Sequence, residues 1–369
     1  MLSRLLSIKR ERGFLPLLSM ILDYSSDMVV SMILLVDAEV KATKNADINW
    51  STRFWLWRHG FISTAPHVFD FENHDPEDYL SHAQHRLRAC KIDEPLIPLF
   101  HDKRIFDQLL NAYGEYLPEC YGVIREGEVR LFENEESRSI ENFLTGPPKG
   151  GLVVKPTEGM GGRGVDIIET VGDDLLLNGK QNDSSDVITA IKSHTDSLLY
   201  ERIQQAGYAA DIYPDASNTL RIITMIDPDT DQAFIARAVH RFGTDASAPV
   251  DNWSRGGICA GVDLETGKLM EVAETPDGGK LKRRKDHPNT GTPVTGAEVE
   301  NWEMIREEIC SIAEYLSRMP YIGWDIIVTD HAFKIIEANG RPGPNTMQIP
   351  GPMLTDERVQ RFYRHHNVI

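Results

Sequence analysis

The sequence predicts an α+β protein. Short β-rich runs at residues 151–155, 165–170, 219–226 and 233–242 are mixed with helical stretches, one of them at 186–194, without regular β-α-β alternation. A long amphipathic helix follows, since apolar residues recur at spacings of three and four: Val299, Trp302, Ile305, Ile309, Ile312 and Leu316. Pro320 marks the expected end of this helix, and YIGWDIIVTD with AFKIIEANG then predicts a two-stranded hairpin.

The bulk composition excludes several classes of protein. A chain of 369 residues favours two or three structural units. Its 39 Lys+Arg against 56 Asp+Glu argue against nucleic acid as a partner, so an anionic ligand needs a local cationic cluster. The four cysteines are far apart and include no C-x-x-C pair, which indicates no disulfide framework or zinc module and fits a reducing, cytoplasmic location.

Residues 1–95 are expected to form a mainly helical region. Its apolar segment at 14–40 is interrupted by Asp23 and Asp27, and no uninterrupted apolar stretch reaches the roughly 18 residues of a membrane span. No small-residue cleavage site follows a short apolar core, so a signal peptide is not expected. The segment predicts a buried helix pair, with a membrane-surface helix as the alternative and membrane association at most peripheral.

A glycine-rich loop lies within GLVVKPTEGMGGRGVDII (151–168), where Gly159, Gly161 and Gly164 satisfy G-x-G-x-x-G. The strand-like residues VDIIET follow, whereas a dinucleotide-binding turn requires a helix at this point. A protein kinase would carry its lysine downstream, but here Lys155 precedes the loop, and no G-K-[ST] is present. The pattern therefore predicts either a plain glycine-tipped hairpin or a phosphate-binding lid with a lysine at its root.

Charged residues in the following strands add to the second interpretation. Glu201 ends an apolar strand and could lie at a hinge that contacts adenine, although an exposed carboxylate at a strand end is the simpler alternative. Arg221 lies within a β-run, and alternation places Arg237, Val239 and Arg241 on one strand face. Such arginines could stabilise negative charge that develops during a reaction. The alternative is that they lie on a strand face exposed to solvent.

The hairpin at 321–340 carries a candidate metal site. Glu337 and Asn339 are two residues apart and share one side of their strand. If the turn near Asp330 has an odd number of residues, Asp325 lies opposite Glu337 on that side. Two carboxylates and an amide oxygen among apolar residues suit Mg²⁺, which also takes nucleotide phosphates as ligands; hydrogen-bonded strand ends are the alternative.

Together these motifs resemble the ATP-grasp superfamily over roughly residues 95–350. NTLRI (218–222), VDNWSRGGICAGVDLETG (250–267), DHPNTG (286–291) and the hairpin are similar to those of the sugar-transfer-associated ATP-grasp group, which is linked to cell-surface polysaccharide biosynthesis. The resemblance implies an ATP-grasp fold, in which two α+β lobes sandwich ATP. It divides the chain into an N-terminal helical region (1–95), a preceding segment (96–150), a small lobe with a glycine lid (151–206) and a large lobe with the metal site (207–369).

The resemblance also implies a role for each matching residue. Contacts to ATP would come from Lys103, Lys155, Glu201, Ile203, a lid of Gly159, Gly161, Gly162 and Gly164, and Asp211 as the candidate ribose-binding carboxylate. Mg²⁺ would be bound by Asp325, Glu337 and Asn339, while Arg221, Arg241 and Asn252 would face the acyl phosphate or acceptor.

The chemistry implied by this resemblance is that of a carboxylate–amine ligase acting on small-molecule or saccharide substrates. ATP phosphorylates a carboxylate, and an amine then displaces phosphate to form an amide, which requires positioning and charge neutralisation but no protein nucleophile. Two alternatives remain open: a kinase that phosphorylates a sugar hydroxyl, and a nucleotide-binding module without turnover.

Overall fold

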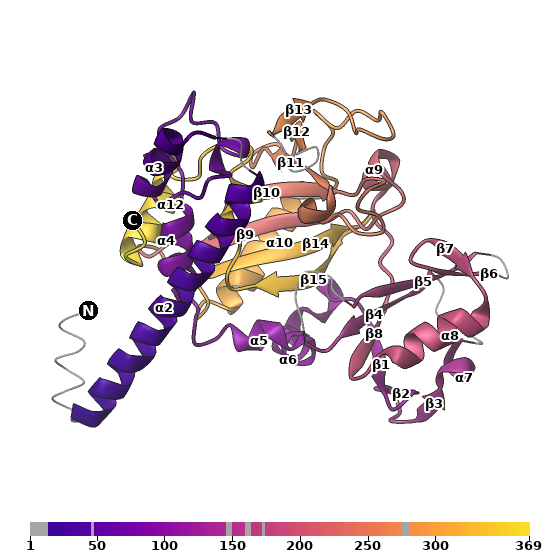
Figure 1. The fold of residues 1–369 in the computed structure, drawn as a ribbon. Coiled ribbons are helices and arrows are strands. Elements are labelled where there is room, and N and C mark those ends of the chain that lie inside the picture. Colours follow the sequence, from indigo (N-terminus) through magenta and orange to yellow (C-terminus); the bar gives the residue numbers. More distant parts are fainter. Residues whose placement is uncertain (1–13, 46–47, 145–149, 159–163, 172–173, 275–279) are drawn as a thin grey trace.

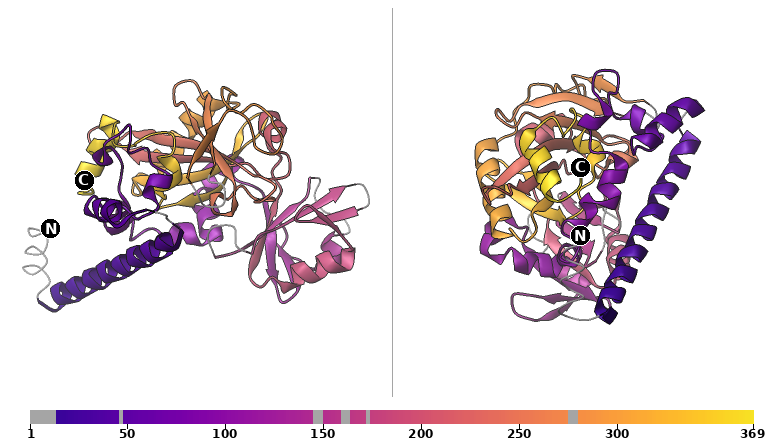
Figure 2. Two further views of the ribbon diagram at one scale, coloured as in Figure 1. Left: turned by 45° about the horizontal axis from the view of Figure 1, so that its top comes forward. Right: turned by 90° about the vertical axis from the view of Figure 1, so that its left-hand side faces the viewer.

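The computed structural model describes residues 14–45, 48–144, 150–158, 164–171, 174–274 and 280–369. Figures 1 and 2 show a helical N-terminal region beside a large sheet, with a smaller sheet carried on the opposite side of the molecule. All pairs of named strands in both sheets are antiparallel. The predicted α+β class is confirmed.

The large sheet has seven strands in the order β13-β12-β11-β10-β9-β14-β15. Its strands are β9 Leu220–Ile226, β10 Ala233–Phe242, β11 Ile258–Val262, β12 Leu269–Glu274, β13 Lys282–Arg284, β14 Tyr321–Val328 and β15 Phe333–Asn339. Its helices are α9 Gly207–Ile212, η5 Trp253–Arg255, α10 Trp302–Tyr315, α11 Pro344–Met347 and α12 Glu357–His365. The predicted strands at 219–226 and 233–242, the long helix and the hairpin are all present.

Strand alternation gives the two faces of this sheet different neighbours. On β9, Leu220 and Ile222 pack in the core cluster that contains the apolar residues of α10. Ile223 and Met225 face the opposite side, where they join a cluster with the apolar residues of α12 and with Leu80 from the N-terminal region. Arg221 alternates with Leu220 and Ile222 and therefore belongs to this second face, beyond the part covered by α12.

The small sheet has eight strands in the order β3-β2-β1-β8-β4-β5-β6-β7. Its strands are β1 Cys120–Arg125, β2 Glu128–Leu131, β3 Ser137–Ser139, β4 Leu152–Pro156, β5 Asp166–Val171, β6 Asp174–Leu177, β7 Lys180–Asn182 and β8 Ser197–Glu201. The helices α7 Ile140–Leu144 and α8 Ser184–Ser193 pack on one face through Ile140, Val187 and Ile191. The sheet thus includes strands that precede residue 151; the proposed division into domains stays a prediction.

The N-terminal region is helical, but the expected pair of buried helices is wrong. Its elements are α2 Phe14–Asn45, α3 Trp50–Arg58, η1 Ala65–His67, η2 Pro76–Asp78, α4 His82–Leu87 and η3 Ala89–Lys91. Residues 14–40 lie within the single helix α2, because no glycine or proline follows Pro16 to end it and an aspartate within a helix does not break it. None of the described helices is both long and apolar enough to cross a membrane.

A short helical connection joins this region to the small sheet. It consists of α5 Pro98–His101, α6 Lys103–Leu109 and η4 Asn111–Tyr116. The N–H of Lys103 donates to the carbonyl oxygen of Thr157 at 3.1 Å, which fixes the start of α6 beside the end of β4. On the other side, Tyr116 stacks on Phe333 of β15 with ring centroids 4.6 Å apart. The connection therefore contacts both sheets.

Candidate functional site

A cavity of about 470 Å³ lies between the two sheets, within the usual size range of small-molecule sites. It is lined by residues of α6, of the small-sheet strands β4, β5 and β8, and of the large-sheet strands β9, β10, β14 and β15. The structure brings ten of the residues singled out from the sequence to its wall: Lys103, Lys155, Glu201, Ile203, Arg221, Arg241, Asn252, Asp325, Glu337 and Asn339.

Five other predicted residues are not placed at this cavity. Asp211 lies on α9, where its carbonyl oxygen accepts a hydrogen bond from Thr292 at 3.0 Å, and it does not line the wall. Gly164 begins the return from the glycine loop with φ +68°, a conformation that glycine adopts readily. The remaining lid glycines, Gly159, Gly161 and Gly162, lie outside the described residues.

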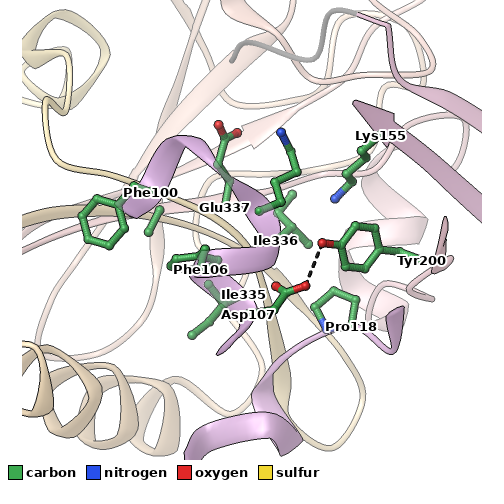
Figure 3. A pocket seen from close by; sticks show the side chains of 11 residues that line it. Phe100, Phe106, Asp107, Pro118, Lys155, Tyr200, Ile335, Ile336 and Glu337 are labelled. Atoms are coloured by element: carbon green, nitrogen blue, oxygen red, sulfur yellow. Dashed lines mark hydrogen bonds between the residues drawn. The ribbon is translucent and has the colours of Figure 1, made fainter. Parts of the chain in front are cut away.

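Two lysines approach the cavity from the small-lobe side. The Nζ of Lys155, on β4, lies 5.3 Å from the ring centroid of Tyr200 on β8. Figure 3 shows the two side chains next to each other. Lys103 is held nearby by its backbone bond to Thr157. The pKa of both ammonium groups lies below its ordinary value, because the effect of burial exceeds the opposing effect of the Glu337 carboxylate. A bound anion between these lysines would offset the cost of burying two like charges.

Beneath the lysines lies a carboxylate that the sequence analysis missed. The hydroxyl of Tyr200 donates to Asp107 Oδ2 at 2.8 Å (Figure 3). Burial raises the pKa of Asp107 to about 6, although the nearby lysines oppose this effect. Asp107 is on α6 and Tyr200 is on β8, so no spacing in the sequence indicates that they meet.

The large sheet contributes a cluster of arginines and carboxylates. Register places Asp325 beside Arg221 on one side and opposite Glu337 on the other. Arg221 forms a bidentate ion pair with Asp325, and Arg241 Nη2 lies 3.3 Å from Asp325 Oδ1. Burial by itself would raise the pKa of Asp325, but the two guanidinium groups hold it below its ordinary value.

The alignment of Asp325 with Glu337 depends on a β-bulge rather than on an odd turn. Val328 pairs with Phe333, so the connection of residues 329–332 has an even number of residues. Between the pairs Asp325–Glu337 and Ile326–Ile335, residue Ile336 is extra on β15. The predicted juxtaposition is confirmed, and the bulge supplies the additional residue that the turn lacks.

Contacts with Thr219 and Asp251 fix the position of Arg241. Its Nε donates to Thr219 Oγ1 at 2.9 Å and lies 3.5 Å from Asp251 Oδ2, while the N–H of Thr219 donates to that same oxygen at 2.8 Å. Asp251 and Thr219 line the cavity but were not singled out, although both lie within stretches that carry the family resemblance. Arg237 shares the strand face of Arg241 but donates to the carbonyl of Pro352 at 2.8 Å and does not line the cavity.

Glu201, at the end of β8, contacts residues next to both sheets. Its Oε1 accepts a hydrogen bond from the N–H of Glu119 at 2.9 Å and lies 3.7 Å from Nζ of Lys334 on β15. Its own N–H donates to the carbonyl of Glu119, and the N–H of Arg202 donates to the carbonyl of Gly151. Both N–H groups are therefore occupied by carbonyl oxygens beside the small sheet.

The oxygen ligands of the candidate metal site are on one side of the hairpin. Asp325, Glu337 and Asn339 all line the cavity, and the burial of Glu337 together with the charge of Asp325 raises the pKa of the Glu337 carboxyl. A cation beside Glu337 would relieve this cost, so the donor set fits a hard divalent ion. Asp325 already shares its oxygens with Arg221, and no group of three or more His, Cys, Asp or Glu residues suited to a metal occurs among the described residues.

The family described as sugar-transfer associated ATP-grasp matches residues 84–363. The chain belongs to this family. Its two sheets with the intervening cavity accordingly form an ATP-grasp fold, preceded by a helical region that lies mostly outside the match. No curated protein matches the chain.

Several solved ligase structures are similar at low identity. The D-Ala:D-Ser ligase VanG from Enterococcus faecalis has 14% identity and a TM-score of 0.38 over 72% of this chain and 62% of that one. The D-alanine–D-alanine ligase from Helicobacter pylori has 13% identity and a TM-score of 0.40 over 72% and 61%. The chain thus spans about three fifths of the length of these two proteins, and a likeness of this degree carries no conclusion about substrate or reaction.

Proposed function

We propose that this ATP-grasp protein is an ATP- and Mg²⁺-dependent carboxylate–amine ligase that forms an amide through an acyl phosphate on a sugar or polysaccharide-linked substrate. One observation carries the proposal: the cavity joins two partly buried lysines, Lys103 on α6 and Lys155 on β4, to paired arginines and carboxylates of the large sheet. Membership of the sugar-transfer associated family supports the saccharide context.

In this proposal the lysines bind the nucleotide phosphates. Lys155 and Lys103 are both poorly solvated, and each supplies a positive charge to the same part of the cavity. The glycine lid at 159–164 would cover the phosphates, as first expected from the sequence. The adenine would contact apolar wall residues such as Val153 and Ile167, together with Ile203. Because the N–H groups of Glu201 and Arg202 are occupied, Glu201 would contact adenine through its side chain or carbonyl oxygen.

Glu337, Asn339 and an oxygen of Asp325 are the residues that would hold Mg²⁺. The ion supplies positive charge that neutralises the phosphate oxygens. Whether or not it binds the metal, the carboxylate of Asp325 also orients Arg221 and Arg241 at the cavity wall. A carboxylate shared between a metal and an arginine would couple the nucleotide site to the acceptor site.

The arginines suit the two steps of amide formation. First, a substrate carboxylate oxygen attacks the γ-phosphorus of ATP, the bond from phosphorus to the bridging oxygen breaks, and ADP leaves. The amine nitrogen then attacks the carbonyl carbon, the bond from carbon to the phosphate oxygen breaks, and orthophosphate and one proton leave. Negative charge remains on the reacting group throughout, so fixed guanidinium groups at Arg221 and Arg241 stabilise both transition states.

The kinase alternative needs a base beside the sugar hydroxyl. No described histidine lines the cavity: His240 lies on the other face of β10, 2.8 Å from the hydroxyl of Tyr208, and His287 Nε2 contacts the carbonyl of Gly243 at 2.8 Å. A carboxylate of the cavity wall could still act as this base. The two reactions differ in their products, because the ligase releases ADP and orthophosphate whereas the kinase releases ADP alone.

Product analysis with ATP, Mg²⁺ and candidate saccharide carboxylates therefore tests the proposal. ATP turnover should rise with the correct carboxylate, and hydroxylamine should trap a hydroxamate without the natural amine. Replacement of Arg221 by Met should lower hydroxamate formation by about 100-fold, as for loss of one preorganised charge donor, while Arg318→Met at an exposed turn leaves it unchanged. If phosphate appears on a stable sugar product and no orthophosphate is released, the ligase proposal is wrong and the protein is a kinase. If the protein binds nucleotide without turnover under all conditions, it is a binding module.

A further inference from the structure

We propose that the exposed apolar surface of α2 and α3 docks peripherally on a lipid bilayer that contains anionic lipids. This N-terminal apolar surface consists of Val29, Val30, Met32, Ile33, Leu34, Val36 and Val40 on α2 and of Trp50, Phe54 and Trp57 on α3. It precedes the residues that match the family, and the inference does not depend on the reaction catalysed.

Exposed apolar side chains are concentrated in this part of the molecule. Of the fifteen large hydrophobic residues that are exposed among the described residues, eleven fall between Val29 and Trp57. Ile33 is 60% exposed, Val36 62% and Trp50 73%. The other four are scattered over α6, the loop after β2, β12 and α10. A concentration of this kind on a soluble protein marks an interaction surface.

The width of the surface favours a bilayer over a single partner helix. Met28, Leu35 and Ala42 are at least partly covered and mark the face of α2 that packs on the protein. At about 100° per residue, the exposed aliphatic side chains from Met32 through Ile33 to Leu34 spread over an arc of about 200°. A two-stranded coiled coil would bury only a narrow seam of this arc, whereas a lipid phase contacts its whole width.

The helix that follows carries aromatic side chains suited to the boundary between lipid and water. Trp50, Phe54 and Trp57 recur at spacings of four and three residues and thus share one face of α3, and the rings of Trp50 and Trp57 lie 6.4 Å apart. Tryptophan favours membrane interfaces because its ring is apolar and its N–H is polar. Figures 1 and 2 show α2 as a rod at the edge of the molecule, and in Figure 1 α3 lies to one side of its C-terminal end.

Charge distribution favours anionic lipids. Residues 1–58 contain 8 Lys+Arg and 6 Asp+Glu, whereas residues 59–369 contain 31 and 50. The net charge is therefore +2 in the first part and −19 in the second. The positive excess of the first part comes from Arg4, Lys9, Arg10 and Arg12, which precede α2 in the chain and lie outside the described residues. Of the two parts, only the first carries a net charge that a negative surface attracts. Within the exposed arc, Lys41 and Asp37 pair with each other at 2.6 Å, which reduces the cost of placing them near lipid.

Co-sedimentation of the full chain with vesicles tests the inference. The protein should bind vesicles of phosphatidylcholine with phosphatidylglycerol, bind pure phosphatidylcholine more weakly, and be released by a carbonate wash. High salt should weaken the binding, since exposed charges are screened. The paired substitutions Ile33→Glu with Val36→Glu, and Trp50→Ala with Trp57→Ala, should each reduce binding by at least about tenfold because each removes apolar contact area.

Tyr315→Ala provides a matched control, since Tyr315 is 54% exposed on α10, which packs on the sheet face opposite the one that Leu80 contacts, and this variant should bind like the wild type. Unchanged thermal unfolding would show that the variants are folded, and quenching of tryptophan emission by brominated lipid should disappear in the Trp50, Trp57 variant. Absence of wild-type binding, or wild-type affinity in both paired variants, would overturn the inference. A dimer in sedimentation velocity that requires Ile33 and Val36, without vesicle binding, would instead assign the surface to a second copy of the chain.

Discussion

Replacement of Lys155 by methionine is the most direct perturbation of the proposed nucleotide site. Methionine keeps an unbranched apolar stem of similar length, while the ammonium group and its cation–π contact with the Tyr200 ring are removed. Because Lys155 is buried and its pKa is lowered by burial, the free protein gains little stability from this charge. The loss should therefore appear in nucleotide binding rather than in folding.

The expected size of the effect follows from one charge-assisted contact. A hydrogen bond between Lys155 and a phosphate oxygen contributes about 1.5–3 kcal/mol, which corresponds to about 10- to 150-fold in affinity. The remaining cation, Lys103, shares the same part of the cavity and limits the loss. At a nucleotide concentration of about 100 Kd, the wild type gains about 2.7 kcal/mol of stability from the ligand. A 100-fold weaker variant would gain only about 0.4 kcal/mol under the same conditions.

Thermal unfolding with and without ADP and Mg²⁺ measures this difference, and calorimetric titration gives Kd directly. ATP turnover should fall at least as much as affinity. Lys192→Met on α8, where the exposed ammonium group pairs with Glu141, is the control and should leave both quantities unchanged. Wild-type affinity and turnover in the Lys155 variant would refute the role of this lysine and leave the glycine loop as a plain hairpin.

Three further predictions concern single side chains. Glu337→Gln should raise the Mg²⁺ concentration needed for turnover by at least about tenfold, and an unchanged Mg²⁺ titration would argue against a metal there. Asp93 is 1% exposed, and burial raises its pKa to about 8; folding is therefore favoured when the carboxyl is protonated, and stability is lost as pH rises from about 4 to 8. Asp93→Asn should thus be more stable than wild type at pH 8, by at most about 5 kcal/mol, with the gain vanishing near pH 4 in denaturant titrations. Gly257→Ala should lower stability by about 1–3 kcal/mol because a Cβ would lie 2.4 Å from the carbonyl oxygen of Asp251, whereas Gly343→Ala, which meets open space, should not.

Local periodicity in the sequence correctly predicted several elements of both sheets. Alternation in β10 correctly predicts that Arg237 and Arg241 share one strand face, and spacings of three and four correctly predict α10. These predictions succeed because a strand or a helix repeats its side-chain direction every two or 3.6 residues, regardless of what packs against it. Local patterns failed for residues 14–40, which were expected to form a buried helix pair but lie in the single helix α2 with exposed apolar side chains. Periodicity alone does not indicate whether another part of the protein packs over an apolar helix.

The sequence by itself determined which residue types reach the site, through motifs that place Lys155 before a glycine loop and Glu337 with Asn339 on one strand. Only the tertiary structure decided how they meet: the bulge at Ile336 aligns Asp325 with Glu337, and the bond from Lys103 to Thr157 brings α6 to the end of β4. It also decided that Asp107 accepts a hydrogen bond from Tyr200 beneath the lysines. Such contacts join residues far apart in the chain, so they depend on sheet register and on the packing of one element against another, which no spacing within a single segment contains.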